Sequence, residues 1–395
     1  MSTGEIRSAG ERLPTLTGMR WLAALSVFVY HAVWETFPAE LFGETGGRLV
    51  SNLGWVGVSF FFVLSGFVLA WSAKPGDTVR RFWRRRLLKI YPNHLVTLTA
   101  ALLLALWAGA EVTGVLPGAL LIQSWWYDPS ISMGGNPVSW SISCELVFYA
   151  TFPLWRRLIA RIAPEHLWYW AAGLAAVVIC LPFAAGLLPE RPYLPWAPNP
   201  AWQFWFVYVF PLTRMMEFVL GVLMARIVRE GRWAGPGLVG ATAALAVGYA
   251  ISLYVPVLFV FAAATVVPLA LLIAAGATAD VRGTRSPLRG RVMVRLGEIS
   301  FAFYLWHHMV LTRITGAFGT DEWSTAAATA VVALSLLVTL VLAWLLHRLV
   351  EEPVMRRFGR PAGKERTPPT GHGGPKAAPR EGGRPERESA LPHGG

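Results

Sequence analysis

The feature that most constrains this chain is a series of apolar stretches, each close to the ~20 residues that a helix needs to cross a bilayer. Hydrophobic residues make up 54% of the chain and charged residues only 15%, whereas a soluble domain is about 25% charged. The sequence therefore predicts an all-α polytopic membrane protein with about ten transmembrane helices, surrounded by a lipid bilayer. The predicted spans are residues 19–37, 53–73, 87–108, 139–155, 167–188, 202–225, 236–254, 257–279, 297–316 and 324–347.

A shorter apolar run, GVLPGALLIQSWW at residues 114–126, contains a proline and ends in two tryptophans. It is too short to cross a bilayer comfortably, and tryptophan favours the membrane interface. We therefore expect one short re-entrant or interfacial helix here.

The positive charges of the loops support this assignment, because Lys and Arg concentrate in cytoplasmic loops. With ten spans and a cytoplasmic N-terminus, the loop clusters of Arg and Lys fall on the cytoplasmic side. If residues 114–126 also crossed the membrane, that pattern would break. The sequence thus predicts a multi-pass protein of the cell membrane with both termini cytoplasmic. These clusters also account for much of the net charge of +12, so nucleic acid is not an expected partner.

The end of the chain differs in composition from the rest. From about residue 359 it is rich in Pro, Gly, Arg and Glu and has almost no large apolar side chains. Such a segment buries too little surface to fold. We expect a transmembrane domain over residues 1–358 and a disordered cytoplasmic tail over 359–395.

The first apolar stretch contains two ionisable residues, Arg20 and His31, in the segment RWLAALSVFVYH. Eleven helical positions return them to nearly the same face, about 20° apart, with a separation of roughly 16 Å along the axis. Ionisable groups are costly inside a membrane. Arg20 is either an anchor at the cytoplasmic boundary or a substrate contact, and His31 is either a structural histidine or a general base.

Two further spans contain ionisable residues. Glu145 lies in PVSWSISCELVFYATFPL, more than one turn inside a helix whose first turns carry serines. His307 and His308 lie in LGEISFAFYLWHHMVL, and Tyr304 shares the face of His307 because it precedes it by three residues. Adjacent helical residues point in different directions, so one of the two histidines is expected to serve packing alone.

The densest positive patch is RRFWRRRLLKIYP, residues 80–92. It is either ordinary cytoplasmic loop charge or a phosphate-binding mouth, because arginine suits the phosphates of a nucleotide such as coenzyme A. The chain has no Walker loop, HExxH or CxxC pattern, and no GxGxxG placed after a strand, so no metal and no Rossmann-bound cofactor are expected.

Together these residues resemble the acyltransferase-3 family of integral-membrane O-acyltransferases. In length, and in lacking an attached extracellular domain, the chain is most similar to the actinobacterial branch that acylates hydroxyls of macrolides and ansamycins. The matching segments, in family order through residues 13–358, are LTGMRWLAALSVFVYH, GWVGVSFFFVLSGFVL, RRRLLKIYP, NPVSWSISCELVFY, ISFAFYLWHH and LVEEPVMRRF.

The resemblance implies a transmembrane acyltransferase domain, acyl-CoA as co-substrate and an alcohol or sugar acceptor. Two departures stand out. Ser59 replaces an acidic residue common in the second motif, and Leu146 replaces the second of two carboxylates, so only Glu145 is kept. The residues expected to carry catalysis are Arg20, His31, Glu145, Tyr304 and His307, and those expected to bind the donor are Arg84, Arg85, Arg86 and Lys89.

The expected reaction is transfer of a short acyl group from acyl-CoA to a hydroxyl, giving an ester. In this scheme His31, oriented by Glu145 or by a backbone carbonyl, takes the hydroxyl proton, and Arg20 or a tyrosine stabilises the oxyanion. Ser65 is a speculative acyl carrier. The alternatives are O-acylation of a surface glycan or lipid-linked sugar, a proton-coupled exporter that uses the same buried groups, and a scaffold that recruits partners through its tail.

Overall fold

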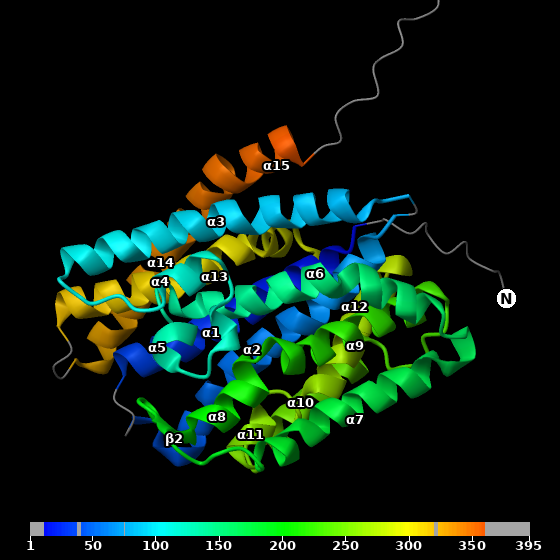
Figure 1. The fold of residues 1–395 in the computed structure, drawn as a ribbon, viewed down its shortest axis with the longest axis horizontal. Coiled ribbons are helices and arrows are strands. Elements are labelled where there is room, and N and C mark those ends of the chain that lie inside the picture. The colour runs from blue at the N-terminus through cyan, green and yellow to red at the C-terminus, as the bar shows by residue number, and fades with distance from the viewer. Residues whose placement is uncertain (1–11, 38–40, 75, 320–322, 360–395) are drawn as a thin grey trace, which may run out of the picture. The chain divides into compact units, whose positions relative to one another are not determined.

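The computed structural model describes residues 12–37, 41–74, 76–319 and 323–359, and it is a helical bundle with one small two-stranded hairpin (Figure 1). Each predicted span overlaps a long helix. All but the first residue of the predicted tail, 359–395, lies outside the described residues. The long helices are α1 (Pro14–Thr36), α2 (Gly43–Ser72), α3 (Val79–Trp107), α6 (Trp140–Ala160), α7 (Leu167–Ala185), α9 (Pro211–Arg229), α10 (Leu238–Ser252), α12 (Val266–Val281), α13 (Arg291–Phe318) and α14 (Thr325–Leu346).

Short elements connect the long helices. Strands β1 (Tyr193–Leu194) and β2 (Ala197–Pro200) pair antiparallel. The remaining pieces are the helices α4 (Val115–Ala119), α5 (Pro129–Ser132), α8 (Ala201–Phe204), α11 (Val257–Val260) and α15 (Glu352–Phe358), the 3-10 turns η2 (Gln123–Trp125), η3 (Pro137–Ser139), η4 (Pro164–His166) and η6 (Pro287–Arg289), and the π-turns η5 (Trp205–Val209) and η7 (His347–Glu351).

Six helical segments of the described chain are long and apolar enough to cross a membrane, and α10 and α12 are shorter apolar helices. Three of these segments are the single helices α1, α2 and α3, and the other three join neighbouring elements: η4–α7, α8–α9 and α14–α15. Helices α6 and α13 are not among them, and both carry polar side chains of the site described below. The segment 114–126 forms only the short elements α4 and η2, as expected for a stretch that does not span.

Two predicted spans are interrupted. Span 202–225 breaks at Phe210, which is extended and precedes the proline at the start of α9, because a residue before proline disfavours the helical region. Span 257–279 breaks between α11 and α12, and the Phe261 carbonyl in that break accepts bonds from the side chains of Ser59 and Arg214.

Helices α2 and α9 pack at very short range because each has a glycine at the contact. A Cβ on Gly66 would collide with the Phe218 carbonyl, and a Cβ on Gly221 would collide with the Val63 carbonyl. Small residues at such crossings let backbones approach closely in membrane proteins. Helix α1 packs against α2 and α13, with α3 and α15 on one side of the bundle and α7 on the opposite side (Figure 1).

Candidate active site

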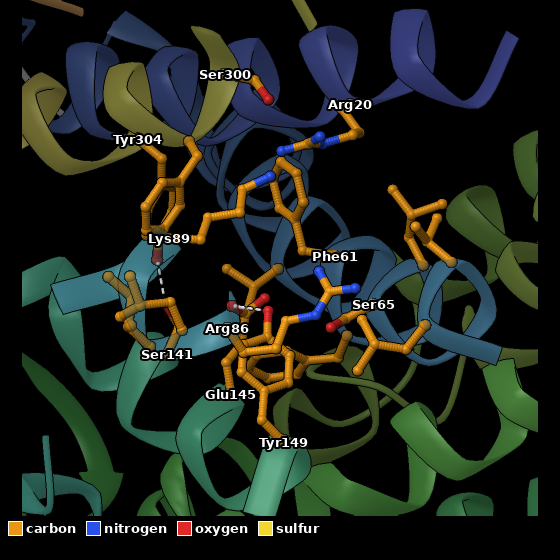
Figure 2. A pocket seen from close by; sticks show the side chains of 18 residues that line it. Arg20, Phe61, Ser65, Arg86, Lys89, Ser141, Glu145, Tyr149, Ser300 and Tyr304 are labelled. Carbon is orange, nitrogen blue, oxygen red and sulfur yellow. Dashed lines mark hydrogen bonds between the residues drawn. The ribbon is translucent and has the colours of Figure 1, made fainter. Parts of the chain in front are cut away.

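A cavity of about 120 Å³ lies among α1, α2, α3, α6 and α13 (Figure 2). Its apolar wall comes mainly from α2. Its polar lining contains three cations and one carboxylate, together with five hydroxyl side chains. The polar residues are Arg20, Arg86, Lys89, Glu145, Ser65, Ser141, Tyr149, Ser300 and Tyr304.

Glu145 is the single carboxylate that lines this cavity. Tyr149, one turn further along α6, donates a hydrogen bond of 3.0 Å to Glu145 Oε2. Arg20, Lys89 and Arg86 all interact electrostatically with this carboxylate. The structure therefore brings together four of the residues expected at the site, from three different helices.

Glu351 is a second buried carboxylate at this site, and our sequence reasoning gave it no role. The Asn93 side-chain amide lies 3.2 Å from Glu351 Oε2 and donates to the Lys89 carbonyl, also at 3.2 Å. His347 Nδ1 lies 3.3 Å from the same carboxylate, and Lys89 and Arg20 interact with it electrostatically. Three basic side chains, Arg20, Arg86 and Lys89, thus lie near two buried carboxylates, Glu145 and Glu351.

The four basic residues of α3 that were expected to bind the donor have different surroundings. The Arg86 guanidinium lies 5.6 Å and 5.8 Å from the ring centres of Phe82 and Tyr149, and it lines the cavity with Lys89. Arg85 is bound by Asp77, whose pKa is lowered by the hydrogen bonds from that guanidinium. Arg84 is exposed.

His31 and His307 form a direct pair between α1 and α13. His31 Nδ1 lies 3.0 Å from the Val27 carbonyl and 3.1 Å from His307 Nε2, and His307 Nδ1 lies 2.5 Å from the Tyr304 carbonyl. A carbonyl only accepts, so both Nδ1 atoms carry hydrogen in the neutral pair, and His307 Nε2 accepts from His31. His31 Nε2 is then the nitrogen with a free lone pair.

His308 also lies against His31, with ring centres 4.8 Å apart, and its Nε2 is 3.6 Å from Glu35 Oε1. Both adjacent histidines therefore contact His31, one by a hydrogen bond and the other by its ring. The partners of His31 are Val27 and His307, so a backbone carbonyl orients this side chain in place of Glu145. Neither His31 nor His307 lines the cavity.

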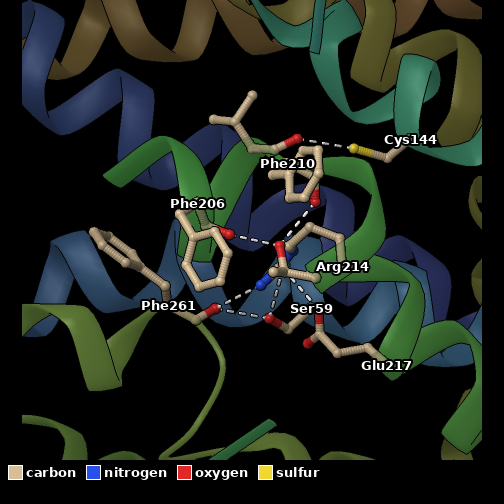
Figure 3. Close-up of polar contacts among 9 residues, drawn as sticks. Ser59, Cys144, Phe206, Phe210, Arg214, Glu217 and Phe261 are labelled. Atoms are coloured by element: carbon tan, nitrogen blue, oxygen red, sulfur yellow. Dashed lines mark hydrogen bonds and ion pairs between the residues drawn. The ribbon is translucent and has the colours of Figure 1, made fainter. Parts of the chain in front are cut away.

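Arg214 and Glu217 on α9 form a fully buried ion pair that the sequence reasoning missed (Figure 3). Arg214 Nη2 lies 3.0 Å from Glu217 Oε2 and donates to Ser59 Oγ at 3.0 Å. Its guanidinium also lies 4.9 Å from the Phe62 ring centre. The sequence does contain a sign of this pair, because two opposite charges stand three residues apart inside an apolar span.

The described residues contain no group of three or more His, Cys, Asp and Glu side chains arranged to hold a metal ion. The polar groups of the site are cations, carboxylates, hydroxyls and an unprotonated imidazole nitrogen. This set suits the binding of an anionic ligand next to a general base.

Comparison with known proteins identifies the family. Residues 13–348 match the family described as an acyltransferase domain. The chain is 48% identical over 362 residues to Acyltransferase MdmB of Streptomyces mycarofaciens, covering 88% of this chain and 93% of that protein. It is 24% identical over 387 residues to the putative peptidoglycan O-acetyltransferase YrhL of Bacillus subtilis, and 23% identical over 387 residues to the peptidoglycan O-acetyltransferase OatA of Listeria monocytogenes.

Those two matches cover 88% and 89% of this chain but only 56% and 57% of the two peptidoglycan O-acetyltransferases, so the chain spans little more than half of their length. No solved structure matches the chain significantly. The six ordered motifs, the helical membrane fold and the family match over 13–348 lead to one conclusion. The chain belongs to the acyltransferase-3 family and is a membrane O-acyltransferase.

Proposed function

We propose that the protein transfers a short acyl group from acyl-CoA to a hydroxyl of a macrolide- or ansamycin-like natural product. One observation carries this proposal: a cavity with an apolar wall and a surplus of positive charge adjoins a histidine pair with one unprotonated nitrogen. Tyr304 joins the two parts, because it lines the cavity and its ring centre is 5.4 Å from that of His307.

The donor fits the cavity by charge and polarity. Arginine forks and a lysine bind phosphates, and Arg86 and Lys89 present their cations to the cavity. Arg84 remains exposed for a phosphate at the mouth, whereas Arg85 is held by Asp77. The apolar wall of α2 suits the acyl and pantetheine parts of the donor. By the loop-charge pattern, we propose that the donor enters from the cytoplasmic side.

The proposed chemistry uses His31 as the general base. His31 Nε2 takes the proton of the acceptor hydroxyl, and the oxygen attacks the thioester carbonyl. Tyr304, which lines the cavity and lies against the His307 ring, stabilises the negative charge on the carbonyl oxygen. Arg20, roughly 16 Å from His31 along α1, helps to bind the anionic donor. Collapse of the intermediate breaks the C–S bond, and the leaving thiolate takes the proton to give free coenzyme A and an ester. His307 orients His31, and Glu145 holds the three cations in place.

The comparisons support a natural-product acceptor over a glycan. The chain is 48% identical to Acyltransferase MdmB but only 24% and 23% identical to the two peptidoglycan O-acetyltransferases. O-acylation of a surface glycan is the second acceptor class to test.

The test uses purified protein in lipid nanodiscs with radiolabelled acetyl-CoA or propionyl-CoA. The acceptors are a macrolide, an ansamycin and a soluble glycan oligosaccharide. We expect labelled ester with the first two, and a loss of roughly 100-fold or more in His31→Ala. His166→Ala, in an exposed turn, is the control. Full activity of His31→Ala would remove His31 as the base.

A proton-coupled exporter is the second candidate, because His31, His307, His308 and Glu35 form a continuous chain of titratable groups. Such chains carry protons in transporters. Efflux of a macrolide from proteoliposomes under a pH gradient, without any acyl donor, would favour the exporter. Ester formation that requires acyl-CoA and no gradient would favour the enzyme.

A further inference from the structure

One side of the cavity is closed by a triangle of three oxygens. Tyr304 Oη lies 3.0 Å from Ser141 Oγ and 3.2 Å from the Val138 carbonyl, and Ser141 Oγ lies 3.0 Å from the same carbonyl. Both side chains are buried and both line the cavity. Figure 2 shows the bond between Tyr304 and Ser141 on the side of the cavity opposite Ser65.

The triangle uses both hydroxyl protons. The carbonyl can only accept, so one hydroxyl donates to it and the other donates to the carbonyl or to the first hydroxyl. In every such arrangement Tyr304 has no hydrogen left to donate to a ligand. Tyr304 can stabilise an oxyanion only after the triangle has opened.

Tyr304 lies between the cavity and the histidine pair. Its ring contacts the cavity on one side and the His307 ring on the other. His31, which is partly exposed, and His307 lie beyond Tyr304 and do not line the cavity. A thioester in the cavity is therefore separated from the base, and from any water that the base activates, as long as Tyr304 is held in place.

We propose that Ser141 and Tyr304 form a latch that keeps the acyl donor apart from the histidine pair until the acceptor is bound. This inference rests on the proposed function. Ser141 is a positioning residue that holds Tyr304, and opening of the latch frees the Tyr304 hydroxyl to donate to the thioester oxygen. A loosened latch admits water, which adds to the thioester carbonyl. The C–S bond then breaks to give a carboxylic acid and the free thiol of coenzyme A.

The experiment measures the ratio of acyl-CoA hydrolysis without acceptor to acyl transfer with a macrolide acceptor. We expect Ser141→Ala to raise this ratio about five- to tenfold, as loss of one buried hydrogen bond predicts. Ser141→Thr keeps a hydroxyl and should return the ratio to the wild-type value. Tyr304→Phe breaks the latch from the other helix, so its ratio should also rise even though both absolute rates fall.

Ser143→Ala is the matched control, because Ser143 is also buried on α6 but does not line the cavity. An unchanged ratio in both Ser141→Ala and Tyr304→Phe overturns the latch. So does an equal rise in Ser143→Ala, which would show a general disturbance of α6. Wild-type protein that consumes no acyl-CoA with or without acceptor overturns the proposed function itself, and the latch with it.

Discussion

Glu351 and Glu352 are neighbours in the chain but have different surroundings. Glu351 is 7% exposed and lies against Asn93 and His347. Glu352 pairs with Arg348 at 2.9 Å and with Arg356 at 3.9 Å, on a more exposed face. The π-turn η7 ends between them, and such turns frequently occur at functional sites. The pair therefore offers a test in which neighbouring identical residues are expected to behave differently.

We predict that Glu351→Gln raises the KM for acyl-CoA roughly tenfold or more, whereas Glu352→Gln stays within about twofold of wild type. Removal of the buried charge weakens the hydrogen bond from Asn93, whose amide also bonds to the Lys89 carbonyl, and so loosens the support of Lys89. A hydrogen bond to a charged group contributes about 1.5–3 kcal/mol. Steady-state kinetics on folded protein, verified by size-exclusion chromatography, measures the effect. Equal KM values for the two variants would contradict the role of Glu351.

The buried pair of Arg214 and Glu217 supports a prediction about a departure from the family pattern. The resemblance to the family implies an acid at the position of Ser59, and the Ser59 Oγ lies 3.0 Å from Arg214 Nη2. Glu217 thus provides from α9 the negative charge that an acid would provide from α2. We predict that Glu217→Gln destabilises the protein by about 3–5 kcal/mol, because it leaves a buried charge uncompensated.

The double variant Ser59→Asp/Glu217→Gln should recover most of this loss, because the new carboxylate starts next to the guanidinium. Ser59→Asp alone places two carboxylates at one arginine and should also destabilise. Thermal unfolding in detergent compares the stability of the wild type, the two single variants and the double variant. Additive losses in the double variant would show that the two sites do not share Arg214.

At the residue scale, sequence reasoning singled out Arg20, His31, Glu145 and the Tyr304–His307 pair as the residues to examine, but it could not assign their partners. His31 and His307 are 276 positions apart, and their contact depends on how α1 packs on α13. Of the two orienting groups expected for His31, Glu145 or a backbone carbonyl, the structure has the carbonyl, that of Val27. Arg214 and Glu217 are visible in the sequence as two opposite charges three residues apart, but the contact of Arg214 with Ser59 on α2 depends on helix packing.

At the element scale, the crossing of α2 and α9 depends on two glycines. We predict that Gly221→Ala destabilises the protein by about 1–3 kcal/mol, because its methyl group would meet the Val63 carbonyl and force the helices apart. Gly173→Ala on α7 is the control, since a Cβ there meets open space. It should be neutral or stabilising by up to about 1 kcal/mol, because alanine favours helix. Melting temperatures in detergent compare the two.

A similar loss in Gly173→Ala would mean that the effect is not specific to the crossing. The approximate limits of the long helices were predictable, because apolar stretches of about 20 residues indicate helices that can cross a bilayer. Helices α6 and α13, which carry polar side chains of the site, are nevertheless not among the six segments that are long and apolar enough to do so. The two breaks were not. The break at Phe210 has a local signal in Pro211. The break after α11 has its partners in Ser59 and Arg214, which lie on other helices.

At the scale of the whole molecule, the family's motifs converge although they are scattered along the sequence. The cavity draws residues from five helices, beginning with Arg20 and ending with Tyr304, and the last motif adds Glu351 from η7. Each of the five motifs that line the cavity contributes between one and three polar groups to it. The sequence therefore shows which helices carry the polar groups. Which of these groups face one another depends on how the helices pack.

This distribution predicts where the chain can be shortened. Every residue assigned to the cavity, the histidine pair or the buried carboxylates lies between 20 and 351, so deletion of 360–395 should leave kcat/KM for acyl transfer within about twofold of wild type. Truncation after Leu346 also removes His347 and Glu351, and it should abolish transfer even where the protein still inserts. Both truncations are compared in nanodiscs at equal amounts of folded protein.

If the tail recruits partners as a scaffold, deletion of 360–395 abolishes function in cells while purified protein keeps full activity. If purified protein loses activity on that deletion, the tail contributes to catalysis and the site is larger than the one assigned to residues 20–351.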